Sequence, residues 1–183
     1  SGNRVAATLT INTLFGSGFI AGRTGVLLNN EMDDFALPDG QPNTYGLIGR
    51  TANAVEPGKR PLSSMTPTFV ETDRGVYVLG TPGGSRIISM LLLAVLDIAS
   101  DRVPSPMEIV RGPRYHHQFL PDRVEVEPDA FGAGWTEVLR QRGHAVQTGG
   151  RAWGNMQLVF VDRASGAVTT ANDPRGRSGV AWY

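Results

Sequence analysis

The sequence predicts an α/β or α+β fold with a mainly antiparallel sheet, formed as a single domain over residues 1–183. Two pairs of short β-type runs flank turn sequences, within residues 68–79 and 156–170, as expected for antiparallel hairpins. An apolar run with helical character occupies residues 85–99. Strands, then helices, then strands favour a layered sheet with helices packed on its faces.

The first residues alternate in polarity. Val5, Leu9 and Ile11 are separated by residues such as Thr8 and Thr10, and this period of two predicts a half-buried strand over residues 4–12. The glycines of residues 15–18 end it in a flexible turn, and a short buried strand is predicted over residues 25–29.

A long segment without periodicity, residues 36–65, is rich in Pro, Gly and Asn and is predicted to be a loop. Loops of this length inside a compact domain are usually functional or disordered.

The remaining elements follow from turn and helix signals. A hairpin of residues 68–72 and 76–79 turns at Asp73-Arg74-Gly75, and a closing hairpin joins residues 156–161 to 167–170. A second helix is expected over residues 130–141, ending at Gly143. Its expected core-facing residues are Phe131, Trp135, Val138 and Leu139.

Composition narrows the class of protein. Lys plus Arg and Asp plus Glu are both 17, so no net charge attracts nucleic acid or an anionic membrane. The sequence has no cysteine, which excludes disulfides and thiolate chemistry within it. The apolar run of residues 87–98 is too short to span a bilayer, so it is predicted to be a buried core helix. The chain begins Ser1-Gly2-Asn3-Arg4, and we expect an upstream segment to be missing.

A glycine-rich turn, Gly80-Thr81-Pro82-Gly83-Gly84-Ser85-Arg86, precedes the first helix. Unpaired amides at a helix N-terminus favour negative charge, and glycines let a substrate approach the backbone closely. The phosphate-binding loop pattern is not met, because Ser85-Arg86 follows Gly84. The turn is therefore either structural or an oxyanion site.

Three polar side chains near strand ends, Asn12, Glu31 and Asp34, would suit a cationic amino group. The alternative is a solvated strand end or a helix-capping pair, and for Asp33 this alternative is the preferred interpretation. A metal is disfavoured because the acidic spacing matches no calcium loop, and no cofactor is predicted.

A serine pair flanked by prolines and cations, Ser63-Ser64 in PGKRPLSSMTPT, could donate hydrogen bonds to a carboxylate or form a turn. It lacks the Gly-x-Ser-x-Gly pattern of a nucleophile elbow. His116 and His117 are adjacent and so point to opposite sides of an extended chain, which favours structural hydrogen bonding over metal ligation.

These segments together resemble the small subunit of gamma-glutamyltranspeptidases, which are N-terminal-nucleophile hydrolases with a four-layer αββα sandwich. The resemblance runs from Gly2 to Tyr183. The matching motifs are LNNEMDDF at residues 28–35, PGKRPLSSM at 57–65, PGGSRII at 82–88, PRYHHQ at 113–118 and DPR at 173–175.

The resemblance implies an enzyme that cleaves γ-glutamyl amides, such as glutathione, and transfers the group to water or to an amino acid or dipeptide. A precursor cleaves itself into large and small subunits, and the freed N-terminal threonine of the small subunit is the nucleophile, its α-amine the base. Implied roles are orientation of the nucleophile for Thr10, α-ammonium binding for Asn12, Glu31 and Asp34, α-carboxylate binding for Ser63 and Ser64 with a large-subunit arginine, and oxyanion amides for Gly83 and Gly84.

The sequence departs from the family at its start. The family's small subunit begins Thr-Thr-His-x-Ser about ten residues before the position of Gly2-Asn3, and residues 1–183 contain no such segment. Ser1 is not a suitable replacement because it precedes the predicted strand. We therefore expect a truncated, trimmed or incompletely ordered fragment that is inactive alone, from a parent protein that is an enzyme.

Residues 38–47 resemble the family's lid, with Tyr45 walling the donor pocket, which implies a preference for small donors. The rival interpretations are a cephalosporin (glutaryl) acylase of the same fold and a non-catalytic γ-glutamyl-binding paralogue. A Thr-Thr-His upstream of Ser1 would favour the enzyme over the binder. By resemblance the protein is periplasmic or secreted, and its partner is the large subunit of the same precursor.

Overall fold

The computed structural model describes residues 2–179. Contacts divide the chain into two compact units, one of residues up to 8 and from 65 onward, the other of residues 9–64. Each unit is described by itself. The prediction of a single domain over residues 1–183 stays a prediction.

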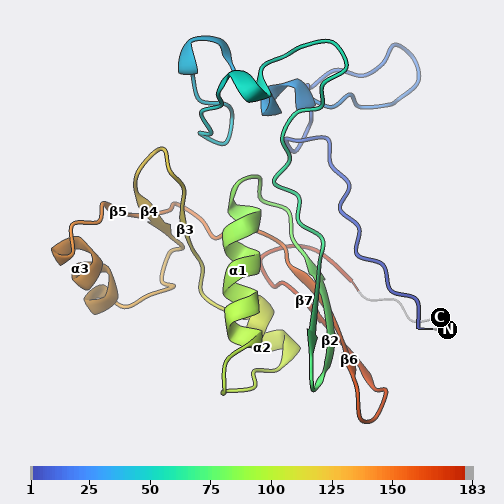
Figure 1. The fold of residues 1–183 in the computed structure, drawn as a ribbon, viewed down its shortest axis with the longest axis vertical. Coiled ribbons are helices and arrows are strands. Elements are labelled where there is room, and N and C mark those ends of the chain that lie inside the picture. The colour runs from blue at the N-terminus through green and yellow to red at the C-terminus, as the bar shows by residue number, and fades with distance from the viewer. Residues whose placement is uncertain (1, 180–183) are drawn as a thin grey trace. The chain divides into compact units, whose positions relative to one another are not determined.

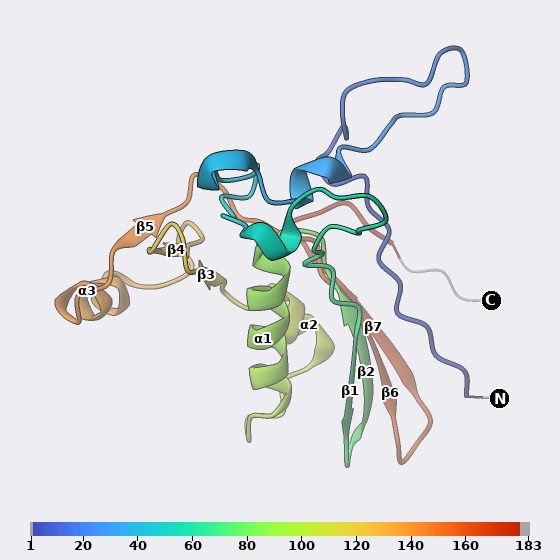
Figure 2. The same cartoon turned by 45° about the horizontal axis from the view of Figure 1, so that its top comes forward.

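The first unit contains a four-stranded antiparallel sheet in the order β1-β2-β6-β7. Figure 2 shows these four strands side by side, with β2 and β6 in the middle. The two hairpins predicted from the turns are confirmed, and their bounds are β1 Thr68–Thr72, β2 Gly75–Gly80, β6 Gln157–Asp162 and β7 Val168–Asn172.

A second sheet has three strands in the order β3-β4-β5, with the β4–β5 pair parallel. The sheets are thus mainly antiparallel, and the fold is α+β, as the sequence predicts. These strands have three residues each, β3 Tyr115–His117, β4 Val124–Val126 and β5 Val146–Thr148. They are too short to give a recognisable period-two pattern, and the sequence does not predict them.

Three α-helices complete the first unit: α1 Arg86–Ile98, α2 Pro106–Arg111 and α3 Ala133–Gln141. Helix α1 confirms the helix predicted from the apolar run. None of the helices in the described part of the chain is both long and apolar enough to cross a membrane. Ser105 caps the start of α2 in a reciprocal capping box. Its hydroxyl accepts a hydrogen bond from the amide of Glu108, and the Glu108 carboxylate accepts one from the amide of Ser105.

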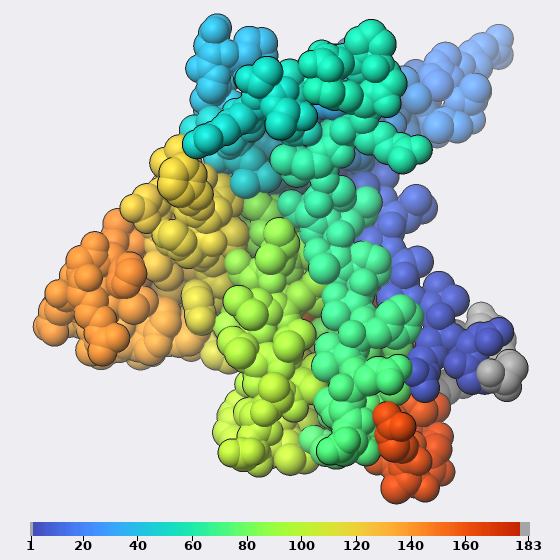
Figure 3. Space-filling model, viewed as in Figure 1, coloured from blue at the N-terminus to red at the C-terminus, as the bar shows by residue number. Residues whose placement is uncertain are grey.

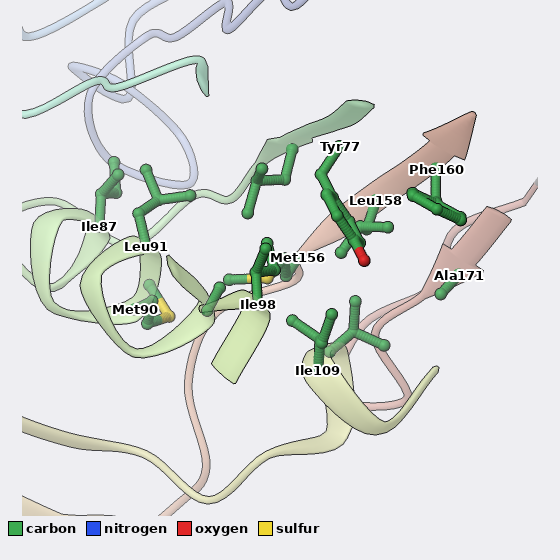
Figure 4. Packing of buried hydrophobic residues seen from close by; sticks show 13 residues of the cluster. Tyr77, Ile87, Met90, Leu91, Ile98, Ile109, Met156, Leu158, Phe160 and Ala171 are labelled. Carbon is green, nitrogen blue, oxygen red and sulfur yellow. The ribbon is translucent and has the colours of Figure 1, made fainter. Parts of the chain in front are cut away.

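The core lies between α1, α2 and the strands β2 and β6 (Figure 4). Tyr77 and Leu158, from the two central strands, and Met90 of α1 are each only 1% exposed. Burying a side chain of this size contributes about 1.5–3 kcal/mol. The buried members that α1 supplies are Ile87, Met90, Leu91, Ala94 and Ile98.

The opposite side of α1 is apolar too. Ile88, Leu92 and Leu96 repeat every four residues and are 57%, 56% and 55% exposed. Figure 3 shows residues of this helix, in yellow-green, reaching the surface. A helix that is apolar on two sides is typical of the interior of a larger structure.

A buried ionic network ties the ends of these elements together. Arg114 donates to the Asp173 carboxylate at 2.5 Å, and Arg175 bridges Asp173 to Glu127. The side chains of Arg114 and Asp173 are 3% and 0% exposed. Burial acts to raise the pKa of Asp173, but hydrogen bonds from the backbone amides of Arg175 and Met156 and from Arg114 outweigh it and lower that pKa.

Two predicted strands are wrong. Residues 2–11 form no strand, and Val5 and Leu9 are 80% and 99% exposed, because no strand within residues 2–179 pairs with them. Residues 25–29 contribute only an isolated bridge between Ile20 and Leu27.

The predicted second helix is correct in kind but wrong at its start. It begins at Ala133 rather than at residue 130, since Asp129 has φ +55° and Gly132 is extended. None of its residues is buried, so Val138 and Leu139 are not core residues. Phe131 instead stacks on Trp135, with ring centroids 4.1 Å apart, and both rings contact Tyr115.

The second unit is mostly loop, as predicted for residues 36–65. Its helical parts are three short 3-10 helices: η1 Glu31–Asp34, η2 Pro38–Gly40 and η3 Thr51–Asn53. The side chains of Asn12 and Asn53 donate hydrogen bonds to backbone carbonyls at the two ends of η1, those of Asn30 and Asp34.

Candidate functional site

A tight turn presents Asn12. The residue has φ +71°, a left-handed conformation that asparagine tolerates better than most residues. Its amide donates to Thr10 Oγ1 at 2.7 Å, and its side-chain Nδ2 donates to the carbonyl of Asn30 at 3.1 Å. The structure thus brings Thr10 and Asn12 together and places Asn12 beside the start of η1.

Asn30 holds the other side of this turn. Its Oδ1 accepts hydrogen bonds from both the amide and the hydroxyl of Thr13, each at 3.1 Å. Three side chains and two backbone groups therefore hold residues 12–13 against residue 30. Asn30 was not predicted as a site residue, because its role depends on contacts between segments that are distant in sequence.

The carboxylates of Glu31 and Asp34 interact within η1. Burial, followed by the charge and hydrogen bonding of Glu31 and the charge of Asp33, raises the pKa of Asp34 to about 6. Oε1 of Glu31 is buried and accepts no hydrogen bond from a donor in the described residues. A cation or a proton shared by the two carboxylates would relieve both conditions, so the pair is suited to an ammonium group.

Tyr45 contacts the turn that contains Asn12. Its hydroxyl donates to the carbonyl of Asn12 at 2.9 Å. The Asp33 carboxylate accepts the amide of Thr44 at 3.1 Å, which fixes the neighbouring residue of this loop to η1. Asp33 thus contacts the loop rather than serving as a solvated end.

Ser63 is exposed and Ser64 is half-buried, and each makes an interaction of its own. The residue before them is tied to η1 through Asn53. This side chain accepts from the amide of Leu62 at 3.0 Å and donates to the carbonyl of Asp34 at 2.8 Å. The predicted carboxylate-binding and ammonium-binding segments are therefore connected by one asparagine.

The glycine turn belongs to the first unit. Gly83 and Gly84 have φ +150° and +57°, which other residues adopt only with strain. A Cβ at Gly83 would lie 2.7 Å from the buried Met90 side chain. Neither glycine amide donates a hydrogen bond to another residue of the described range, and both precede α1, where amides favour negative charge.

The two histidines behave as predicted. His116 is buried, with Ser89 Oγ at 2.7 Å from its Nδ1 and Gln118 Oε1 at 2.8 Å from its Nε2. Burial lowers the pKa of His116, which favours the neutral imidazole. His117 is on the exposed side, 2.9 Å from Asp122. In residues 2–179 no group of three or more acidic, His or Cys side chains could hold a metal ion.

The fold and the site define the class of the protein: an α+β chain with polar loops that are suited to an ammonium-bearing ligand. The gamma-glutamyltranspeptidase family model matches residues 1–183. The chain belongs to the gamma-glutamyltranspeptidase family, as its motifs predict.

Relatives agree with this membership. The glutathione hydrolase proenzyme of Escherichia coli is 46% identical over 175 residues, 95% of this chain and 30% of that protein. The chain therefore spans about 30% of the length of that curated relative.

Solved structures are similar as well. The T380A mutant of Helicobacter pylori gamma-glutamyltranspeptidase matches with TM-score 0.89 at 40% identity, covering 96% of this chain and 95% of that one. A cephalosporin acylase from Bacillus halodurans matches with TM-score 0.76 at 25% identity, covering 92% of this chain and 30% of that one.

Proposed function

We propose that this chain is the small-subunit portion of a γ-glutamyltransferase and glutathione hydrolase, and that it forms the enzyme's αββα sandwich together with the large subunit of its precursor. The observation that carries the proposal is the Glu31–Asp34 carboxylate pair beside Asn12, in a chain of the gamma-glutamyltranspeptidase family. Burial and the charge of Glu31 raise the pKa of Asp34, and a bound cation would stabilise the ionised form of that carboxylate.

The donor is a γ-glutamyl compound such as glutathione. Glu31 and Asp34 pair with its α-ammonium, and the Asn12 amide adds a hydrogen bond. Ser63 and Ser64 donate to the α-carboxylate, helped by an arginine of the large subunit. Tyr45 covers the bound head group, and the γ-carbonyl is left for attack.

In the reaction, a threonine hydroxyl of the precursor, oriented by Thr10, attacks the γ-carbonyl while the threonine α-amine takes the hydroxyl proton. Negative charge develops on the carbonyl oxygen, where the amides of Gly83 and Gly84 stabilise it. The C–N bond breaks as the proton passes to the leaving amine. Water or an acceptor amino acid or dipeptide then attacks the γ-glutamyl ester and releases the threonine.

Substitution of Asp34 by alanine in the full-length protein tests the assignment. Release of p-nitroaniline from a γ-glutamyl anilide should show a KM raised by about tenfold or more, because a charge-assisted hydrogen bond contributes about 1.5–3 kcal/mol. Asp122→Ala removes another acidic side chain, one that is 83% exposed, and serves as the control. Unchanged donor kinetics in Asp34→Ala would count against the proposal.

The match to a cephalosporin acylase supports a second candidate, a glutaryl acylase. A glutaryl side chain lacks the α-ammonium that Glu31 and Asp34 are suited to bind. A higher kcat/KM for γ-glutamyl than for glutaryl amides with the same leaving group favours the transferase, and the reverse ranking favours the acylase.

A non-catalytic binding protein would bind γ-glutamyl compounds without turnover by the full-length protein. We propose that residues 1–183 alone are inactive, and robust anilide turnover by this polypeptide would refute that. We further propose a periplasmic or secreted location, which fractionation of the producing cell can test.

A further inference from the structure

Asn53 occupies a junction in the second unit. It ends the 3-10 helix η3, and its backbone amide donates to the carbonyl of Arg50 at 2.8 Å. Its own carbonyl accepts the amide of Ala36 at 2.9 Å. The backbone of Asn53 is therefore fixed on both sides before its side chain makes any contact.

The side chain of Asn53 joins two segments that are far apart in sequence. Nδ2 donates to the carbonyl of Asp34 at 2.8 Å, and Oδ1 accepts the amide of Leu62 at 3.0 Å. A planar amide that uses both its donor and its acceptor sets the spacing of the two backbones it bridges. One of these segments carries the carboxylate of Asp34, and the other leads directly into Ser63 and Ser64.

Close packing near Asp34 leaves little room for the junction to rearrange. Gly49 lies so near Ala36 that a Cβ at Gly49 would be 2.5 Å from the Ala36 side chain. Asn53 itself is only partly exposed. Loss of its side chain would remove both hydrogen bonds that bridge the two segments.

We infer that Asn53 is a positioning residue for the donor, one that sets the distance between the group binding the α-ammonium and the group binding the α-carboxylate. This inference rests on the proposed function. A zwitterionic head group has its two charges at a fixed separation, so recognition requires both groups at matching positions. Asn53 acts through Asp34 and Ser63-Ser64 and does not itself touch the donor.

The test uses the full-length protein, first shown to hydrolyse a γ-glutamyl anilide. Failure of that first step counts against the proposed function and is separate from failure of this inference. Asn53→Ala removes both bonds, and Asn53→Asp keeps the acceptor for Leu62 but loses the donor to Asp34. Thr51→Ala alters an exposed residue of the same η3 turn and is the matched control.

Two competitive inhibitors with uncharged side chains measure the spacing. One is L-norvaline, which has both head-group charges, and the other is butylamine, which is norvaline without its carboxylate. In Asn53→Ala the inhibition constant for norvaline should rise about tenfold or more, as expected for the loss of two hydrogen bonds. The constant for butylamine should change less, so the preference for norvaline falls, and Asn53→Asp should be intermediate.

The kinetic signature separates positioning from folding. Asn53→Ala should raise the donor KM about tenfold while kcat stays within about threefold of the unsubstituted enzyme. A merely structural defect would lower kcat by reducing the active fraction and leave the norvaline-to-butylamine ratio unchanged. That result, or a Thr51→Ala variant with the same loss of preference, would overturn the inference.

Discussion

The pKa of Asp34 predicts how donor binding depends on pH. Because that pKa is about 6 in the unliganded chain, roughly a tenth of the side chains are ionised at pH 5 and nearly all at pH 7.5. An α-ammonium pairs with the ionised form, so affinity should increase about tenfold over this range. Above pH 7.5 the gain should level off while the ligand amine stays charged.

The raised pKa of Asp34 also affects the free energy of unfolding, which decreases over the pH range in which donor affinity increases. The pKa of Asp34 is raised from 3.8 to about 6, so its favourable contribution is present below pH 3.8 and is lost as the pH rises through 6. The difference corresponds to at most about 3 kcal/mol, and solvent screening of this partly exposed group reduces it to about 1 kcal/mol. A bound ammonium should restore this stability at neutral pH.

The assay is the inhibition constant of L-norvaline against a γ-glutamyl anilide, measured with the full-length protein from pH 5 to 7.5. An unreactive ligand avoids titration of the attacking amine, which would affect the rate. Asp34→Asn should bind weakly at all these pH values, without the tenfold gain. A flat profile for the unsubstituted protein, or the same rise in Asp34→Asn, would refute the reasoning.

Three further substitutions test other parts of the structure. Asp173→Asn leaves Arg114 buried without its full counter-charge and should lower the free energy of unfolding by about 3–5 kcal/mol, measured as a lower midpoint in thermal unfolding. A decrease no larger than that of the exposed control Asp122→Asn would contradict a stabilising role for the ionic network. Gly83→Ala forces a positive φ and contact with Met90, and kcat for the anilide should fall about a hundredfold, whereas near-normal kcat would argue against an oxyanion role. Ser105→Ala removes the cap of α2 and should lower unfolding free energy by about 0.5–2 kcal/mol in urea titrations with kcat unchanged; no change in the midpoint would show that the cap contributes nothing.

Local signals in the sequence were sufficient for the elements that stabilise themselves. The hairpins at Asp73-Arg74-Gly75 and at residues 163–166 are confirmed because turn residues and alternating apolar residues act over a few positions. Helix α1 is confirmed because its apolar residues recur at helical spacing.

The failures involve long-range contacts. The alternation of residues 4–12 describes a chain suited to a sheet, but a strand also needs a neighbour, and residues 2–179 supply none. The start of α3 was missed because the left-handed Asp129 interrupts a pattern that otherwise continues.

For the site, residue type indicated the charged groups but not what holds them. Glu31 and Asp34 belong to a short acidic cluster near a predicted strand end, and the structure places them in one turn. Asn30 and Asn53 carry no signal in the local sequence that marks them for a role, because their roles depend on partners 17 and 19 residues away. No local pattern could have identified them.

The left-handed backbone of Asn12 affects how any substitution there must be interpreted. Its carbonyl accepts from Tyr45 and its amide donates to Thr10, so two of its contacts involve main-chain atoms. An alanine at φ +71° would disturb that main chain as well as delete the side-chain amide. Glycine keeps the backbone geometry at little cost, so Asn12→Gly measures the side chain alone, and its difference from Asn12→Ala measures the turn.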